Sequence, residues 1–368
     1  MRWKKQLLEL SPYKPGKSID EVKKQLGLEE IVKLASNENP FGCSQKVLSA
    51  LKQLQLNTAL YPDGYASQLR ETLASTIEVS PEELIFGNGS DEIIQIISRA
   101  LLQPGTNTVM ATPTFPQYRH NAILEGAEYR EIPLIDGEHD LDGMFAAVDN
   151  GTSVVWLCSP NNPTGTYISE SRLLSFLDKV PSHVLVVLDE AYYEYVVAED
   201  YHDSRELIRR YENIIVLRTF SKIYGLASLR VGYGIANASI IRALEPAREP
   251  FNTNSFAQLA AIEALQDPDF IEDCKMKNRE GLEQYYHFCR ENNLHCYPSQ
   301  GNFILIDFGC DGDKVFQFLL TQGFIVRSGN ALGFPNSVRI TIGSRQQNEA
   351  LLKVIKEFLE TEKIVSPE

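Results

Sequence analysis

The feature that most limits the fold of this chain is a repeated alternation of short β-branched runs with stretches of helical apolar spacing. The first helical stretch, residues 90–102, places Ile93, Ile94, Ile97 and Leu101 on one face. Such alternation is typical of βαβ units around a mainly parallel sheet. The β-branched runs lack in/out alternation, as expected of strands that helices cover on both faces. These runs are ELIFG (83–87), NTVMATP (107–113), SVVWLCSP (153–160), HVLVVLDEAY (183–192) and NIIVLRTFS (213–221).

The pattern changes after about residue 250. Residues 255–292 predict a long helix that is broken near Pro268, and 323–328 and 337–343 read as strands before a closing helix at 347–360. A chain of 368 residues is long enough for two hydrophobic cores. We therefore expect an α/β fold with a smaller α+β part at its C-terminal end. The expected division is an N-terminal arm (1–39) that packs with the small domain, a large α/β domain (40–270) and the small domain (271–368).

Charge and composition exclude several classes of function. A formal net charge of −14 argues against nucleic acid as the main partner, because it would repel phosphate backbones over most of the surface. No apolar run approaches the ~18 residues that a membrane span needs, and the N-terminus lacks the apolar core of a secretory signal. We therefore expect a cytoplasmic protein without a membrane partner. The six cysteines contain no C-x-x-C pair and the six histidines do not cluster, so no metal site is expected.

Polar residues follow each of the apolar runs. In open α/β sheets, ligands bind outside the carboxyl ends of the strands, so these segments are the candidates for a site. Together they supply a phosphate cradle, an aromatic ring, an amide, a carboxylate with a tyrosine, and a lysine. The segments are GNGSDE (87–92), PTFPQY (113–118), SPNNPTG (159–165), DEAYY (189–193) and TFSK (219–222).

The segment GNGSDE predicts a phosphate cradle. Gly87 and Gly89 allow a tight turn, and the free amides at the start of the following helix favour an anion. We expect the Asp91 carboxylate to point away while its amide contributes. The alternative is an ordinary strand–helix turn with Ser90 as the N-cap. A dinucleotide site is disfavoured because Glu92 stands where the Rossmann fingerprint has its third glycine.

Asp189 and Lys222 indicate which kind of ligand the cradle binds. A carboxylate at the rim of the sheet needs a cationic partner, which an arginine or a protonated heterocyclic nitrogen would supply. A lysine in an apolar, positively charged surrounding loses its proton more easily, as a Schiff base with a carbonyl compound requires. With a phosphate cradle and an aromatic ring, these two residues describe a site for pyridoxal 5′-phosphate. Ser221 and Arg230 are close enough in sequence to help hold the phosphate.

The motifs SNENPFG, YPDG, GNGSDE, SPNNPTG, DEAYYEY and TFSKIYGLASLRVGY, in this order, resemble fold-type I pyridoxal-phosphate aminotransferases, specifically the histidinol-phosphate aminotransferase family. The likeness extends from SPYKPGK near the start to VRITIGSRQQN near the end, and so covers nearly the whole chain. Its motifs are highly specific for the fold and cofactor and less specific for the substrate.

The resemblance implies roles for individual residues. Lys222 looks like the lysine that bonds the cofactor and moves the substrate proton, and Asp189 is similar to the partner of the ring nitrogen. Asn162 and Tyr192 would hydrogen-bond the ring's phenolic oxygen, and Phe115 would stack on the face of the ring. The phosphate would be held by the amides of Ser90 and Asp91, by Ser221 and Arg230, and by Tyr61 from the neighbouring subunit of a homodimer.

Substrate recognition is expected from the small domain and the N-terminal arm. Apolar Val338 and Ile340 alternate with Arg339, which places the arginine on the opposite face of a strand, either in a site or in solvent. By resemblance, Arg339 clamps the substrate anion and Arg327 adds a second anion contact. Tyr13 and Asn37 look like substrate-side residues.

The expected reaction is a ping-pong transamination. The amino group passes from glutamate to the cofactor and then to imidazole-acetol phosphate, giving histidinol phosphate and 2-oxoglutarate. The alternatives within this fold are an aromatic or broad-specificity aminotransferase and a decarboxylase of the phosphothreonine type. A dehydrogenase and a non-catalytic regulator that kept the fold are the alternatives from other classes, and an intact Lys222, Asp189 and Arg230 argue against the regulator.

Overall fold

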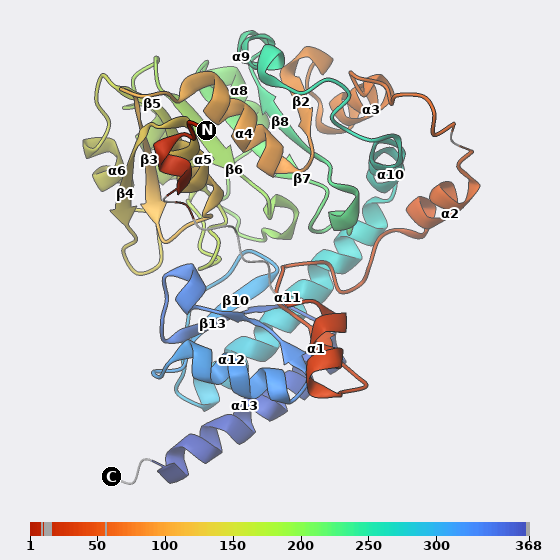
Figure 1. The fold of residues 1–368 in the computed structure, drawn as a ribbon, viewed down its shortest axis with the longest axis vertical. Coiled ribbons are helices and arrows are strands. Elements are labelled where there is room, and N and C mark those ends of the chain that lie inside the picture. The colour runs from red at the N-terminus through yellow and green to blue at the C-terminus, as the bar shows by residue number, and fades with distance from the viewer. Residues whose placement is uncertain (9, 11–16, 56, 366–368) are drawn as a thin grey trace.

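The computed structural model describes residues 1–8, 10, 17–55 and 57–365. Within them, the largest sheet has seven strands in the order β2-β8-β7-β6-β5-β3-β4 (Figure 1). Strand β8 runs antiparallel to both of its neighbours, and all the other pairs are parallel. The strands are β2 (Leu84–Gly87), β3 (Asn107–Thr112), β4 (Glu128–Pro133), β5 (Thr152–Cys158), β6 (Leu185–Asp189), β7 (Ile214–Thr219) and β8 (Gly232–Ala236). All five predicted runs are therefore strands, whereas β4 and β8 were not predicted.

Helices cover both faces of this sheet, which explains why its strands lack in/out alternation. In β7, Ile214 and Val216 belong to one hydrophobic core, whereas Ile215 and Leu217 belong to the core on the other face. The first core is closed by α2 (Gln45–Gln53), α3 (Ser67–Ile77), α6 (Leu141–Ala146), α7 (Glu170–Leu177), α8 (Ser204–Arg210) and α10 (Ser255–Leu265). The second is closed by α4 (Ser90–Leu101), α5 (Gln117–Glu125) and α9 (Ala238–Leu244).

A smaller antiparallel sheet forms the C-terminal part of the fold. Its order is β12-β13-β10-β9, and its core joins Ile304 and Ile340 to Tyr285, Leu319 and Leu351 of the adjoining helices. The strands are β9 (His295–Cys296), β10 (Phe303–Asp307), β12 (Arg327–Ser328) and β13 (Ser337–Thr341). The helices are α11 (Pro268–Glu291), α12 (Gly312–Thr321) and α13 (Arg345–Val365). In Figure 1, α11 leads from the region of α10 into the smaller part.

The predicted break near Pro268 separates α10 from α11. The segment predicted as one strand at 323–328 is divided between two sheets. Its first half, β11 (Phe324–Ile325), pairs in parallel with β1 (Val32–Lys33), and its second half, β12, pairs with β13. None of the helices among the described residues is both long enough and apolar enough to cross a membrane.

The N-terminal segment contacts both parts of the fold. Helix α1 (Ile19–Leu26) begins at Ser18, whose hydroxyl accepts a hydrogen bond from the amide of Glu21 at 3.2 Å, and its Val22 packs into a small core with Leu320. Upstream, Lys4 donates to the carbonyl of Leu124 in α5 at 3.0 Å. The segment therefore touches α5, which covers the large sheet, as well as α12 of the C-terminal part.

Candidate active site

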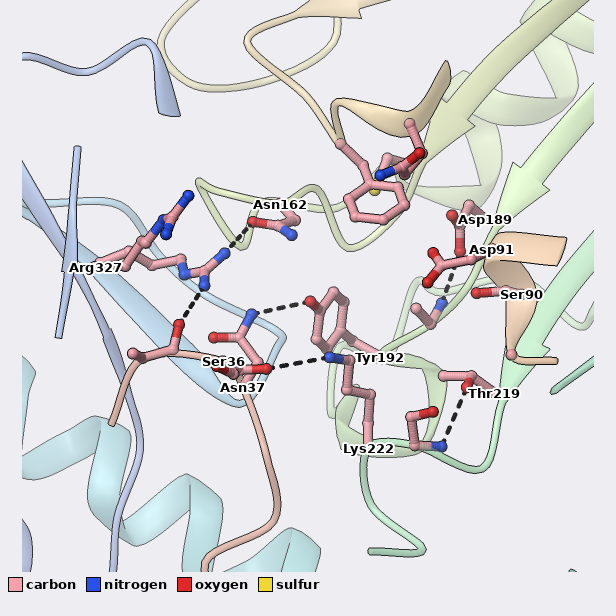
Figure 2. Close-up of a pocket in the computed structure, with 18 of the residues that line it drawn as sticks. Ser36, Asn37, Ser90, Asp91, Asn162, Asp189, Tyr192, Thr219, Lys222 and Arg327 are labelled. Atoms are coloured by element: carbon pink, nitrogen blue, oxygen red, sulfur yellow. Dashed lines mark hydrogen bonds between the residues drawn. The ribbon is translucent and has the colours of Figure 1, made fainter. Parts of the chain in front are cut away.

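A cavity of about 350 Å³ lies at the carboxyl ends of β5, β6 and β7. The large sheet, the segment after β1 and the small sheet all contribute to its wall (Figure 2). Of the predicted site residues, Tyr61 does not line it, and Tyr13 lies outside the described residues. Those that do line it are Asn37, Ser90, Asp91, Phe115, Asn162, Asp189, Tyr192, Ser221, Lys222, Arg230, Arg327 and Arg339.

Asp189 ends β6 as a buried carboxylate, with 3% of its surface exposed. Its Oδ2 accepts a hydrogen bond from the Tyr118 hydroxyl at 2.7 Å, and its Oδ1 accepts one from the amide of Ala191 at 3.2 Å. Burial raises the pKa of Asp189 to about 6, although the hydrogen bond from Tyr118 acts in the opposite direction. The carboxylate is therefore poised to gain from a cationic partner in the cavity.

Lys222 follows β7 and reaches the same cavity as Asp189. Its ammonium nitrogen lies 3.4 Å from the carbonyl oxygen of Ser36 and 5.6 Å from the ring centroid of Tyr192. Burial, and then the positive charge of Arg339, lower the pKa of Lys222 to about 8. A neutral amine, the form that attacks a carbonyl carbon, is thus accessible near neutral pH.

The predicted phosphate cradle is built around Gly89. This residue has φ +76 and is the N-cap of α4, so the alternative of Ser90 as the N-cap is wrong. A Cβ at position 89 would lie 2.8 Å from Nη2 of Arg230, which shows how closely the arginine approaches the turn. Arg230 Nη1 is also 3.4 Å from the hydroxyl of Ser221. The first amides of a helix, a hydroxyl and a guanidinium therefore surround one space, as an anion site requires.

The expected direction of the Asp91 side chain is wrong. Its carboxylate does not point away from the cradle: Oδ2 accepts a hydrogen bond from Arg230 Nη2 at 3.3 Å (Figure 2 labels Asp91 beside Ser90). The physical reason is that the cation of Arg230 lies within reach of the carboxylate and attracts it. Both side chains are about half exposed.

Tyr192 and Asn37 meet at the back of the cavity. The Asn37 side-chain amide donates to the Tyr192 hydroxyl at 2.9 Å, and its own Oδ1 accepts from the Thr341 hydroxyl at 3.1 Å. The backbone amide of Asn37 donates to the same threonine oxygen at 2.9 Å. These bonds join the segment after β1 to β13 and to the loop after β6, and they hold the Tyr192 hydroxyl in the cavity wall.

Two arginines of the small sheet enter the cavity side by side. Arg327 of β12 is the cross-strand partner of Arg339 in β13. Val338 and Ile340 lie in the small core, so Arg339 is on the opposite face, as the alternation predicts, and it is 7% exposed rather than solvated. Its Nη1 donates to Asn162 Oδ1 at 2.6 Å and its Nη2 to the carbonyl of Ala35 at 2.7 Å.

Sequence reasoning missed Tyr118. Its ring is fully buried and stacks on Trp156 at 4.9 Å, with Phe115 edge-on at 5.6 Å. No local signal set it apart, because Tyr118 reads as an ordinary residue of α5 (Gln117–Glu125) and Phe115 precedes that helix. In the part of the chain that the structure describes, His, Cys, Asp and Glu side chains form no group of three or more that could hold a metal ion.

Tyr61 is 81% exposed and its ring stacks on that of Phe251, with centroids 4.6 Å apart. It makes no contribution to the cavity of its own chain.

The fold and the site define a class of protein. Residues 29–355 match the family model of class I and II aminotransferases, and the chain belongs to this family and, within it, to the histidinol-phosphate aminotransferases. It is 62% identical over 365 residues to the histidinol-phosphate aminotransferase of Geobacillus sp. (strain WCH70), covering 99% of this chain and 100% of that protein. It is 61% identical over 360 residues to the enzyme of the same description from Bacillus subtilis (strain 168), covering 98% and 100%.

Among solved structures, the fold is similar to histidinol-phosphate aminotransferase from Sinorhizobium meliloti in complex with pyridoxal 5′-phosphate. The TM-score is 0.89 at 27% identity, with 98% of each chain covered. The resemblance seen in the sequence motifs, and the expected large mainly parallel sheet with a smaller C-terminal sheet, are therefore confirmed.

Proposed function

We propose that this chain is a pyridoxal 5′-phosphate-dependent aminotransferase that exchanges an amino group between histidinol phosphate and 2-oxoglutarate, giving imidazole-acetol phosphate and glutamate, in histidine biosynthesis. The observation that carries the proposal is that Asp189 and Lys222, which lie 33 positions apart in the sequence, line one cavity together with an anion cradle. Near full-length identity to histidinol-phosphate aminotransferases supports the choice of substrate.

The residues present fit the cofactor. Asp189 is a buried carboxylate whose pKa burial raises to about 6, so a protonated ring nitrogen is the kind of partner that it lacks. The first amides of α4, with Ser221 and Arg230, would hold the phosphate, and the space between them is one that a Cβ at Gly89 would fill. Phe115 would lie against the ring, and Asn162 and Tyr192 would bond its phenolic oxygen.

Bound in this way, the cofactor would supply an aldehyde that accepts the amino group and a ring that accepts electrons from the substrate. The chain supplies the base: Lys222 Nζ, with its pKa lowered to about 8, is placed to take the proton from the substrate Cα and to return it. Asp189 would keep the proton on the ring nitrogen. Tyr192, whose hydroxyl is held by Asn37, would hydrogen-bond the phenolic oxygen of the ring.

Arg339 and Arg327 are the proposed anion site of the substrates. One half-reaction brings a carboxylate and the other a phosphate, and the planar guanidinium fork matches both groups. Their cross-strand pairing places two like charges together, an arrangement that an incoming anion relieves. Asn37 stands beside them in the wall of the cavity, and Tyr13 remains a proposed substrate contact.

A homodimer is the proposed assembly, with Tyr61 reaching the phosphate in the neighbouring subunit. Leu60 and Tyr65 are exposed apolar neighbours of Tyr61 in sequence, and the half-exposed Phe251 stacks on its ring. An exposed apolar surface of this kind favours a protein partner. Mixing Tyr61→Ala with Lys222→Ala tests the arrangement, because heterodimers would regain intact sites, about a quarter of the total. Mixing that restores no activity would contradict a shared site.

The division into an arm (1–39), a large domain (40–270) and a small domain (271–368) remains a proposal, supported by the separate core of the small sheet and by the start of α11 at Pro268. A cytoplasmic location is also proposed. It is supported by Cys43, Cys158, Cys274, Cys289 and Cys296, none of which forms a disulfide, as is usual in a reducing compartment.

Rates with histidinol phosphate, phenylalanine and tyrosine, each with 2-oxoglutarate as acceptor, test the proposed function. We expect histidinol phosphate to have the highest kcat/KM, and a preference for the phenyl amino acids would instead assign an aromatic aminotransferase. Lys222→Ala should abolish both turnover and the characteristic absorbance of the bound cofactor. Survival of turnover in that variant would overturn the chemistry.

A further inference from the structure

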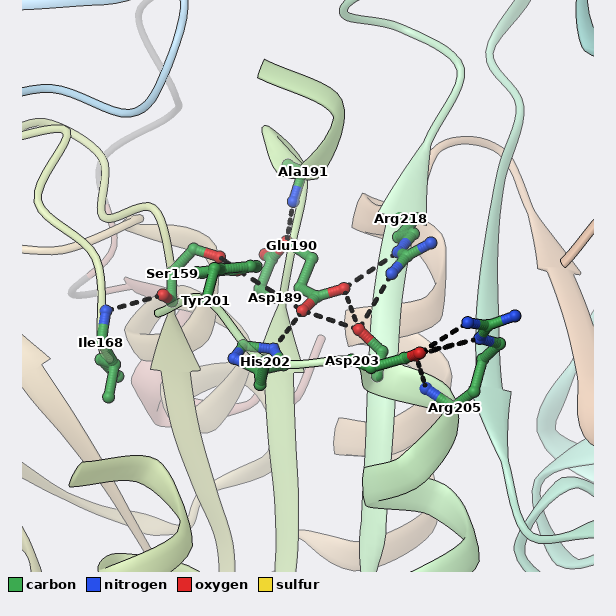
Figure 3. Close-up of polar contacts among 11 residues, drawn as sticks. Ser159, Ile168, Asp189, Glu190, Ala191, Tyr201, His202, Asp203, Arg205 and Arg218 are labelled. Carbon is green, nitrogen blue, oxygen red and sulfur yellow. Dashed lines mark hydrogen bonds and ion pairs between the residues drawn. The ribbon is translucent and has the colours of Figure 1, made fainter. Parts of the chain in front are cut away.

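A buried polar cluster is centred on Glu190, the residue after Asp189 (Figure 3). Glu190 follows Asp189 in the sequence and is fully buried. Successive side chains at the end of a strand point to opposite faces, so Glu190 turns away from the cavity that Asp189 lines. The proposed chemistry gives this carboxylate no role, although it is buried next to Asp189.

The Glu190 carboxylate has several partners. Its Oε2 accepts a hydrogen bond from Arg218 Nε at 2.9 Å, and the Ser204 hydroxyl lies 2.8 Å from the same oxygen. Its Oε1 lies 2.5 Å from His202 Nε2. Arg218 also donates from Nη2 to the Ser204 hydroxyl at 2.9 Å, so the four side chains form one connected network.

The network is fully desolvated and charged. Burial alone would raise the pKa of Glu190, but Arg218 and His202 hold it below its usual value. For Arg218, burial acts to lower the pKa, and the charge of Glu190 acts to raise it. Arg218 also lies over the ring of Tyr193, 3.4 Å from its centroid. Apolar side chains of similar volume are often at least as stabilising as a buried ion pair, so net stability is a weak reason for this arrangement. A fixed geometry is the stronger one.

The pair joins the two segments that carry the reacting groups. Glu190 lies between Asp189 and Tyr192 on the segment after β6, and its backbone carbonyl accepts the amide of Tyr193 at 3.0 Å. Arg218 lies near the end of β7, four positions before Lys222. The Glu190 amide donates to the carbonyl of Leu217 at 2.8 Å, which adds a backbone bond beside the ion pair. The ion pair between Glu190 and Arg218 therefore helps to fix the distance between Asp189 and Lys222.

We propose that Glu190 and Arg218 are positioning residues for the transamination, and this inference rests on the proposed function. Neither side chain lines the cavity, so neither touches the reacting atoms. Their ion pair holds the segment with Asp189 and Tyr192 at a fixed position relative to Lys222. Misplacement of a catalytic group by about 1 Å can slow a reaction ~100-fold, which is the sensitivity that such a pair protects against.

The double variant Glu190→Gln, Arg218→Met tests the proposal. It removes both charges of the pair together, and the side-chain oxygen of glutamine can still accept a hydrogen bond from Ser204 or His202. Arg218→Lys is measured alongside, because it keeps the charge but loses the planar contacts to Tyr193 and Ser204. Asp149→Asn is the control, since Asp149 also pairs with an arginine at 2.8 Å, but its partner Arg130 lies on the edge strand β4, away from β6 and β7.

At full cofactor occupancy, we expect kcat of the double variant to fall about 10- to 100-fold, with KM changed less than about threefold, and kcat of Arg218→Lys to fall about 3- to 10-fold. The pH titration of the bound cofactor's absorbance should shift, and cofactor dissociation should become faster. The control should change none of these. Variants with unchanged kcat, titration and dissociation, and only a lower Tm, would overturn the proposal. Absence of transamination in the unaltered protein would refute the proposed function instead.

Discussion

Tyr118→Phe isolates the hydrogen bond that holds the Asp189 carboxylate. The change removes one oxygen atom and leaves the ring on Trp156, so the packing of this buried position is retained. A hydrogen bond to a charged group contributes about 1.5–3 kcal/mol to stability, and one between neutral groups about 0.5–1.5 kcal/mol. The cost of the substitution should therefore depend on whether Asp189 is ionised.

The direction of this pH dependence follows from the pKa of Asp189, which burial raises to about 6 in the folded protein. A carboxyl group with a raised folded pKa contributes stability at low pH that is lost as the pH rises through that pKa. Without the Tyr118 hydroxyl, the carboxylate is less stabilised, so the pKa of Asp189 rises further, by about one unit, and the loss of stability extends to higher pH. Tyr118→Phe should thus cost about 1 kcal/mol more at pH 8 than at pH 5.

Urea unfolding of the cofactor-free protein at both pH values measures this difference. In the background of Asp189→Asn, the cost of Tyr118→Phe should be the same at pH 5 and pH 8, because the partner no longer titrates. Tyr167→Phe is the matched control: its hydroxyl bonds Asp200 at 2.6 Å on the surface, and its loss should cost less than about 0.5 kcal/mol. Equal costs of Tyr118→Phe at the two pH values in the parent protein would refute the reasoning.

Three further changes test the site and its frame. Arg339→Lys should lower kcat/KM about 10- to 150-fold for both glutamate and histidinol phosphate, because lysine cannot form the paired bonds of a guanidinium; steady-state rates that fall for one substrate alone would contradict a shared anion site. Cofactor capture by the cofactor-free protein should accelerate as the pH rises through about 8, the value to which burial and then Arg339 lower the pKa of Lys222. In Arg339→Gln, the pH midpoint of the capture rate, measured by stopped flow, should move to higher pH. An unchanged midpoint would exclude an influence of Arg339 on the pKa of Lys222. Gly225→Ala should destabilise the protein by about 2–4 kcal/mol in urea, since φ is +70 and a Cβ would overlap the carbonyl of Gly42, whereas Gly27→Ala, at φ +68 with open space around it, should cost only about 1 kcal/mol.

The sequence predicts those strands and helices whose own residues show a clear apolar pattern. The apolar runs predict strands, and their lack of alternation predicts cover on both faces, which β7 shows residue by residue. Because the carboxyl ends of parallel strands share one edge of a sheet, the polar residues after each run were expected to meet. Asp189, Asn162 and Lys222 do line one cavity, although each follows a different strand.

The contacts that the sequence does not predict are those that depend on tertiary distance. The strand β8 was missed because its glycines weaken the β-strand signal. Tyr118 reads as an ordinary helical residue until α5 is packed against the end of β6. Glu190 reads as one more charged residue, because its partner Arg218 lies 28 positions away on another strand. Asp91 was expected to avoid the cradle because a phosphate was assumed there, and Arg230 reverses that expectation.

The position of Arg339 is predicted in part by the local pattern and in part only by the tertiary structure. Alternation places its side chain opposite the small core, but only the arrangement of the two sheets determines whether that face meets solvent or the cavity. Its bond to Asn162 spans 177 positions and joins the small sheet to the loop after β5. In that bond only the guanidinium is charged, so it contributes about 1.5–3 kcal/mol at most, whereas a carboxylate or phosphate makes a contact in which both partners are charged. An incoming anion therefore competes well for the guanidinium, and the same residue that joins the two sheets is available to bind a substrate.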